Sequence, residues 1–154
     1  MSKYNRQAAV AYAEKWALSR NPVYFNFDTL GGDCTNFASQ CLRAGGCPMN
    51  YTKDIGWYYT SPGDRAAAWT GASHLHRFLT QNQGTGPKAV YTSLSLLEPG
   101  DLIQLHNGKA YYHTLMVVGF HEKSPLICAH TDDSYRRPLY TYTYMSATGL
   151  HIQY

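Results

Sequence analysis

The sequence contains no apolar stretch that approaches the roughly 20 residues needed to span a membrane. Its N-terminus, MSKYNRQAAVAYAEKW, carries charged residues within its apolar part and lacks the apolar core of a signal peptide. We therefore expect neither a membrane span nor a recognisable export signal. Three alternatives for its location stay open: the protein remains in the cytoplasm, it leaves by a route that this chain does not encode, or it is a domain of a longer secreted protein.

Charged residues are few, and basic runs are absent. Asp, Glu, Lys and Arg make up 15% of the 154 residues and leave a net charge of +3, so nothing indicates nucleic-acid binding. Hydrophobic residues reach 44%, which is enough for the core of a single domain over residues 1–154. We expect a monomer. The fourteen tyrosines are unusual, and tyrosine-rich clefts suit sugar or peptide ligands.

The four cysteines form neither a disulfide framework nor a zinc motif. They lack the close pairs that structural zinc sites use, and a domain of this size does not depend on disulfides. Cys41 follows Cys34 by two helical turns and Cys128 lies in the apolar run LICAH, so both are expected to be buried, while Cys47 is expected in a loop. We therefore expect no metal ion and no organic cofactor.

The chain divides into a helical first half and a strand-rich second half. Three- and four-residue spacing of apolar residues predicts helices over residues 4–20, 34–44 and 65–81. After residue 84 the pattern changes to short segments rich in strand formers: DLIQLHNG, HTLMVVGFH, PLICAH and GLHIQY. Helices followed by strands indicate an α+β fold, in which N-terminal helices pack on a C-terminal antiparallel sheet.

The segment GGDCTNFASQCLRAGG places a cysteine at the start of a predicted helix. Asp33 is a suitable N-cap, which makes Cys34 the first helical residue. Unpaired backbone N–H groups and the positive end of the helix dipole lie there, and both favour the nucleophilic thiolate. The preceding Gly31 and Gly32 leave room for a substrate. The alternative is a structural cysteine near a turn.

A cysteine nucleophile needs a base, and His113 and His130 are the best-placed histidines. His113 opens the apolar segment HTLMVVGF, and His130 closes the next one, LICAH. If these segments form a hairpin, the two histidines become neighbours at one edge of the sheet. His113 would then be the base, held in one tautomer by His130 or by Asp132. The alternative is that each is an ordinary histidine at a strand end.

The segments GGDCTNFASQCLRAGG, EPGDLIQL, HTLMVVG and HTDDSYRRPL, in this order, resemble the papain-like cell-wall hydrolases of bacteria. These include the CHAP and NlpC-type peptidases, and the resemblance is strongest to the bacterial "putative amidase domain" family. It covers nearly the whole chain. It implies a papain-like fold with Cys34 as the nucleophile and His113 as the base. It also implies a third member at the end of the next strand, where this sequence offers His130, with Asp132 as the rival.

One position departs from papain itself, which has an oxyanion glutamine six residues before its cysteine. Here that residue is Asp28, a poor oxyanion donor. We therefore assign the oxyanion to the Cys34 backbone N–H, with Tyr24 as the candidate for a second donor. The residues expected to face the substrate are Asp33, Tyr24, Trp57, Tyr58 and Trp69, and the alternative for each aromatic residue is ordinary packing.

The resemblance implies hydrolysis of an amide bond in peptidoglycan or a muropeptide, through a thioester acyl-enzyme. The bond would be the muramoyl–alanine amide or one within the stem peptide. Two alternatives remain. The same site could serve a toxin that deamidates a protein or transfers an acyl group, or the chain could be a non-catalytic wall-binding module.

Overall fold

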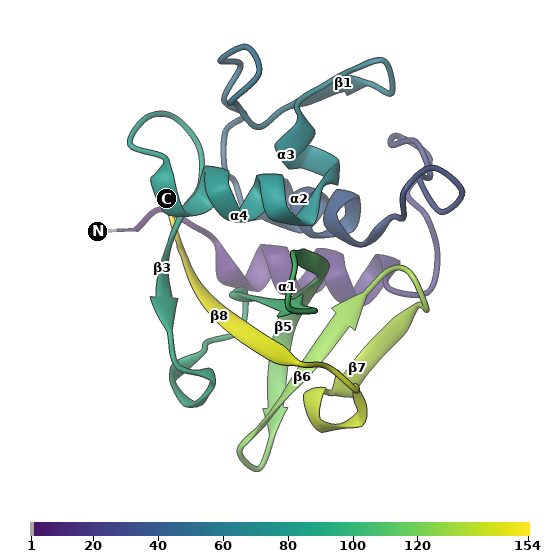
Figure 1. Ribbon diagram of the computed structural model, residues 1–154, viewed down its shortest axis with the longest axis vertical. Helices are drawn as coiled ribbons and strands as arrows, with labels where there is room; N and C mark the ends of the chain where they lie inside the picture. Colours follow the sequence, from purple (N-terminus) through teal and green to yellow (C-terminus); the bar gives the residue numbers. More distant parts are fainter. Residues whose placement is uncertain (1) are drawn as a thin grey trace.

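The computed structural model describes residues 2–154 and has helices in its first half and a large sheet in its second (Figure 1). The α-helices are α1 (Arg6–Trp16), α2 (Cys34–Ala44), α3 (Ala67–Thr70) and α4 (Ala72–Gln81). Strands β1 (Tyr59–Ser61) and β2 (Asp64–Arg65) form a small separate hairpin. The predicted α+β class is confirmed. Within residues 2–154, no helix is both long enough and apolar enough to cross a bilayer.

Two predicted helices differ from those observed. The helix predicted over residues 4–20 is shorter at both ends. It begins at Arg6, because the Asn5 side chain accepts a hydrogen bond from the Ala8 N–H at 3.0 Å and caps α1, and it ends at Trp16. The helix predicted over residues 65–81 is two helices, α3 and α4. Gly71 separates them with an extended backbone, and its N–H closes α3 on the Ala67 carbonyl.

The large sheet is antiparallel, with strand order β3-β8-β4-β5-β6-β7. Its strands are β3 (Lys88–Thr92), β4 (Leu102–His106), β5 (Tyr111–His121), β6 (Ser124–Ala129), β7 (Ser134–Pro138) and β8 (Ser146–Gln153). Short 3-10 helices lie at Leu94–Leu96 and Leu139–Thr141. The predicted hairpin of β5 and β6 forms, and Met116 pairs with Cys128 in it.

The two faces of the sheet support two separate cores. Met116 and Val118 of β5 point to the helices, and Leu115 and Val117 point to the other face, as strand alternation requires. Helix α2 packs against β5 and also contacts α1 and α3. Its residues 34–42 are all buried. The nucleophile candidate therefore sits on the most enclosed helix, which fixes its position relative to β5.

The PGD segment before β4, residues 99–101, binds residues near both ends of the chain. Asp101 is fully buried, and its Oδ1 lies 2.8 Å from Arg6 Nη1 of α1 and 2.9 Å from the Ile152 N–H of β8. Gly100 has a φ of +95°, and a Cβ there would come within 3.1 Å of the Arg6 side chain. The motif therefore ties α1, β4 and β8 together and is remote from Cys34 in the chain.

Replacing Asp101 with asparagine should destabilise the protein by about 3 kcal/mol, because it removes the buried partner of Arg6. The matched control is Glu98→Gln, since the Glu98 side chain is largely exposed and should contribute less than about 1 kcal/mol. Urea unfolding followed by circular dichroism measures both. Equal losses in the two variants would contradict the anchoring role.

Candidate active site

Cys34 is the first residue of α2, and its sulfur lies against the backbone of β5. Thr114 of β5 lowers the pKa of Cys34 through its backbone, and the Thr35 hydroxyl lies 3.8 Å from Sγ and 2.9 Å from the Thr114 hydroxyl. Thr114 directly follows His113, so the predicted nucleophile lies beside the strand that carries the predicted base. Thr114 faces the helices, whereas His113 is on the side of Leu115 and Val117 and packs against Tyr142. Cys34 is 9% exposed, while the other three cysteines are fully buried.

The Cys34 thiol is not activated in the way the sequence suggests. Burial raises its pKa above the ordinary value, and the Asp33 carboxylate adds to the rise. Hydrogen bonds from Thr114 and Thr35 oppose this but are outweighed. The fold therefore disfavours the thiolate that the position at the helix start predicts.

The first turn of α2 is open toward the site. Within residues 2–154, no backbone carbonyl or side chain accepts the Cys34 N–H. Gly31 and Gly32 precede it with φ of +90° and +99°, a conformation that favours glycine. A Cβ at Gly31 would meet nothing within 4 Å. The turn thus offers a free N–H donor beside the sulfur, and the loop before it leaves space on one side.

His113 is a neutral imidazole in this site. It is 9% exposed, and the edge of the Tyr142 ring faces it with 5.9 Å between ring centroids. The pKa of His113 is lowered to about 4, mainly by burial and also by the Arg137 cation, while the Asp132 carboxylate opposes both. A neutral imidazole can accept a proton, so His113 is in the form that a general base requires.

His130 is not the partner of His113. Its Nδ1 lies 2.5 Å from Asp33 Oδ2, its Nε2 lies 2.7 Å from the Trp16 carbonyl oxygen, and its ring stacks on Phe37 at 4.0 Å. Both ring nitrogens are therefore already engaged. The reason is register: extending the β5–β6 pairing sets His130 opposite Thr114, on the helix-facing side of the sheet.

The contacts of His130 also define its charge. A carbonyl oxygen can only accept, so Nε2 carries a hydrogen. Burial would raise the pKa of Asp33, but hydrogen bonds from His130, from the Asn36 side chain and from the Phe27 N–H lower it overall, so Asp33 is a carboxylate. Nδ1 therefore donates as well, and the pair is a buried imidazolium and carboxylate.

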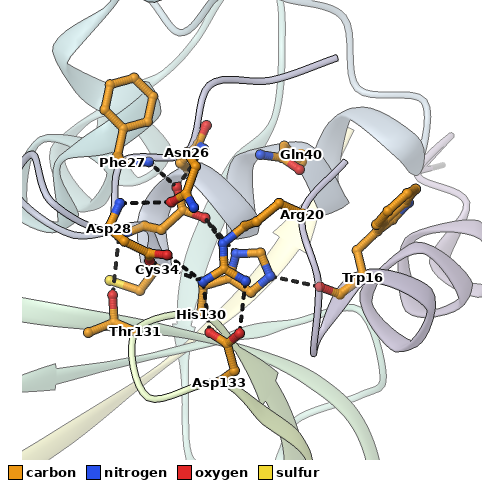
Figure 2. A network of polar contacts seen from close by, with 12 residues as sticks. Trp16, Arg20, Asn26, Phe27, Asp28, Cys34, Gln40, His130, Thr131 and Asp133 are labelled. Atoms are coloured by element: carbon orange, nitrogen blue, oxygen red, sulfur yellow. Dashed lines mark hydrogen bonds and ion pairs between the residues drawn. The ribbon is translucent and has the colours of Figure 1, made fainter. Parts of the chain in front are cut away.

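Arg20 and its acidic partners add further charges beside this pair (Figure 2). Its guanidinium binds Asp133 at 2.8 Å and Asp28 at 3.0 Å, and its Nε lies 3.4 Å from Asp33 Oδ2. Asp28, the residue at the papain oxyanion position, is thus part of an ion-pair cluster. Asp33 is fully buried and faces this cluster, so its predicted contact with substrate is wrong.

The turn between β6 and β7 carries several of these contacts. Thr131 and Asp132 both have a φ of +61°, which is unusual for a β-branched residue such as threonine. The Thr131 hydroxyl accepts the Asp33 N–H at 3.1 Å. The Asp132 side chain is 92% exposed, lies 3.7 Å from Arg137 and raises the pKa of His113. Of the two candidates for the third member, Asp132 is the one whose charge acts on His113.

The predicted aromatic cleft is largely core. Trp57 and Trp69 are fully buried, with their rings 4.7 Å apart, and they donate to the Ser39 hydroxyl and the Asn36 amide oxygen of α2. Their predicted contact with substrate is wrong, because their rings are buried against α2. Tyr24 stacks on Trp69 at 6.0 Å, and burial raises its pKa.

Two other features lie outside the Cys34 site. Tyr58 is half-buried and packs on the exposed Tyr51 at 5.4 Å. A cavity of 390 Å³ lies between residues 50–56 and helices α3 and α4, and neither Cys34 nor His113 lines it.

One group of side chains could hold a metal ion. Ligand atoms of Glu98, Asp101 and His151 lie within 4.8 Å of one another. Arg6 already binds Asp101 Oδ1, and its Nη2 lies 3.4 Å from His151 Nδ1. The Arg6 guanidinium therefore already supplies the positive charge at this cluster.

Sequence reasoning missed Arg20, Thr131 and Arg137. The segment HTDDSYRRPL contains two of them, and its run of charges after a strand was the available signal. Thr131 contacts Asp33 and Arg20 contacts Asp133, and the residues of each pair lie about 100 positions apart in the sequence. No local pattern therefore indicates these contacts.

Comparison with known proteins gives one family and two relatives. The model of the family described as "Putative amidase domain" matches residues 3–153. The uncharacterized protein YhbB of Bacillus subtilis (strain 168) is 38% identical over 141 residues, which are 88% of this chain and 44% of that protein. The uncharacterized protein YjcM of the same organism is 37% identical over 100 residues, 64% of this chain and 22% of that protein. This chain thus spans less than half the length of either relative, and no solved structure matches it.

Replacing Asp33 with asparagine should destabilise the protein by about 3–5 kcal/mol at pH 7, because it leaves the His130 imidazolium buried without its partner. The pKa of Asp33 is lowered in the fold, so its stabilisation is present above the ordinary carboxyl pKa of about 3.9 and is lost as the pH falls through the folded-state value. The difference from the unsubstituted protein should therefore shrink below about pH 4.

Thermal unfolding at pH 3 to 7 measures this difference. Asp28→Asn is the control, since that carboxylate is part of the same cluster but is 40% exposed, and its loss should cost less than about 1 kcal/mol. A difference between Asp33→Asn and the unsubstituted protein that does not change with pH would contradict the ion pair.

Proposed function

Because this chain belongs to the "Putative amidase domain" family, we propose that it is a cysteine-dependent amidase with Cys34 as its nucleophile and His113 as its base. The family description concerns hydrolysis of amide bonds. The observation that carries the cysteine mechanism is the position of Cys34 at the head of α2, where the Thr35 hydroxyl links it to Thr114, the neighbour of His113 in β5.

The first step follows from the charge states of the two groups. Both are neutral at rest, since burial raises the pKa of Cys34 and lowers that of His113 to about 4. The His113 imidazole takes the thiol proton as the sulfur attacks the substrate carbonyl, and a C–S bond forms. The negative charge moves to the carbonyl oxygen, where the free Cys34 N–H and the positive end of the α2 dipole stabilise it.

The second step returns the proton. The His113 imidazolium donates it to the leaving amine as the C–N bond breaks, which leaves a thioester on Cys34. Asp132 stabilises the cation during this interval, because its carboxylate already raises the pKa of His113. His113 then takes a proton from water, whose oxygen attacks the thioester carbonyl. The C–S bond breaks, the imidazolium returns the proton to the Cys34 sulfur, and the acid product leaves.

We propose that the amide lies in peptidoglycan, either between muramic acid and alanine or within the stem peptide. The support is the resemblance of the nucleophile and histidine segments to bacterial cell-wall hydrolases. Tyr112, which is 45% exposed and directly precedes His113, places an aromatic ring beside the site, as sugar and peptide ligands favour.

Replacing Cys34 with serine should abolish release of soluble fragments from purified sacculi while leaving the fold intact. The control is Cys47→Ser, because burial raises the pKa of Cys47 to about 12 and makes that thiol unreactive at neutral pH. Mass spectrometry of the fragments identifies the bond.

Equal release by Cys34→Ser and the unsubstituted protein would overturn the cysteine mechanism. Intact sacculi together with a one-dalton gain on a protein glutamine would move the same site to a protein substrate. Binding to sacculi without either activity would indicate a wall-binding module.

The acid limb of kcat/KM should lie near pH 4, because His113 must be neutral to accept the thiol proton. Asp132→Asn removes the charge that raises the pKa of His113, so the limb should move to lower pH. Arg137→Gln removes the charge that lowers it, so the limb should move to higher pH. Initial rates on a defined muropeptide between pH 3 and 8 measure this, and shifts in the same direction would contradict the assignment.

A further inference from the structure

A line of polar side chains leads from Cys34 along the helix-facing side of the sheet to the surface, and its first three members are buried. It consists of Thr35, Thr114, Gln104 and His76, and it ends at the Tyr91 hydroxyl. We propose that this line is a one-way chain of hydrogen bonds whose donors all point toward the Cys34 sulfur, with the Thr35 hydroxyl as the final donor to the forming thiolate. The inference rests on the proposed function in taking Cys34 as the nucleophile.

Gln104 sets the direction of the chain. Its amide lies 2.9 Å from the Ala72 carbonyl, which can only accept, so the atom facing Ala72 is the nitrogen. The same nitrogen lies 3.2 Å from the Thr114 hydroxyl and donates its second hydrogen there. The Gln104 oxygen, on the other side, must accept. The amide is fully buried, so it is held in this orientation by its partners on both sides.

The two threonine hydroxyls continue the direction. Thr114 receives its hydrogen bond from Gln104, so its own hydrogen is free to donate to the Thr35 hydroxyl 2.9 Å away. The Thr35 hydrogen is then free for the Cys34 sulfur at 3.8 Å. The opposite direction would leave the Thr114 hydrogen without an acceptor among residues 2–154, and Thr114 is fully buried.

The surface end agrees with this direction. The Gln104 oxygen lies 2.9 Å from His76 Nδ1, so this nitrogen carries the hydrogen. His76 Nε2 is then free to accept from the Tyr91 hydroxyl at 2.8 Å. Burial lowers the pKa of His76, and the neighbouring His106 lowers it further, which keeps the ring neutral, while Gln104 opposes them. The ring stacks on Tyr111 at 4.0 Å and so stays in place.

The chemical role follows from the needs of the sulfur. Burial and the Asp33 carboxylate both disfavour the thiolate that must form during attack. His113, next to Thr114, receives the proton of the thiol. A further group must stabilise the negative charge that develops on the sulfur. A hydroxyl already aimed at the sulfur needs no reorientation when charge develops, and hydrogen bonds to ionised groups are stronger than those to neutral ones. Thr35 is therefore a catalytic residue, and Thr114 and Gln104 are positioning residues.

The test is the pH dependence of Cys34 alkylation by iodoacetamide in the folded protein. Cys34 is the most exposed of the four cysteines, so native alkylation reports on it, and peptide mass spectrometry verifies the site. Thr35→Val should raise the apparent thiol pKa by about one unit and slow alkylation at pH 7 about tenfold. Thr35→Ser keeps the hydroxyl and should restore the pKa of the unsubstituted protein.

Gln104→Glu tests the direction of the chain with a side chain of nearly the same shape. A carboxylate accepts from Thr114, which would turn both threonine hydroxyls away from the sulfur, so the Cys34 pKa should rise. Thermal unfolding is measured on every variant. If Thr35→Val is unfolded, the comparison of Gln104→Glu with Gln104→Met decides, because only the glutamate reverses the polarity and should raise the pKa further.

An unchanged thiol pKa in Thr35→Val, or a serine variant no better than the valine one, would overturn the proposal. Because alkylation needs no substrate, the two hypotheses fail separately. A shifted pKa without any amide hydrolysis would retain the hydrogen-bond chain and reject the proposed function. Cys34-dependent hydrolysis with no shift of the thiol pKa in any of these variants would retain the proposed function and reject the hydrogen-bond chain.

Discussion

The contact between the Asp33 carboxylate and the His130 imidazolium is the interaction on which the rest of the site depends. Asp33 directly precedes Cys34, and His130 directly follows β6. This one ion pair therefore joins the first turn of α2 to the sheet. Through Nε2, His130 also binds the Trp16 carbonyl at the end of α1. Three elements far apart in the chain therefore meet within one residue of the nucleophile. A buried pair is costly to break, which makes the position of the sulfur hard to disturb.

This anchoring has an electrostatic cost for the chemistry. The Asp33 carboxylate and the burial that accompanies it raise the pKa of Cys34, while burial lowers that of His113. The resting site therefore holds a thiol and a neutral imidazole, not an ion pair. In the proposed mechanism negative charge develops on the sulfur during attack, and the hydroxyl of Thr35 is positioned to stabilise it. Rigid placement of this donor offsets a poor ground-state nucleophile.

Much of the architecture was predictable because it follows from local patterns. Apolar spacing indicated α2 to the residue, and the change of period after residue 84 indicated the sheet. The break at Gly71 and the late start of α1 were missed, since both depend on backbone conformation at single residues. The tryptophans were misassigned, because an aromatic residue looks the same in a sequence whether it faces a ligand or packs against a helix.

The sequence by itself determined the α+β order, the cysteine at the head of a helix and the histidine at the start of a strand, since each is written within a dozen residues. Only the tertiary structure decided which side chains meet. A shift of one residue in strand pairing moves a side chain to the opposite face, so the register of β5 and β6 turned His130 toward Asp33 and away from His113. Burial, which sets the charge of both reacting groups, likewise exists only once the elements have packed.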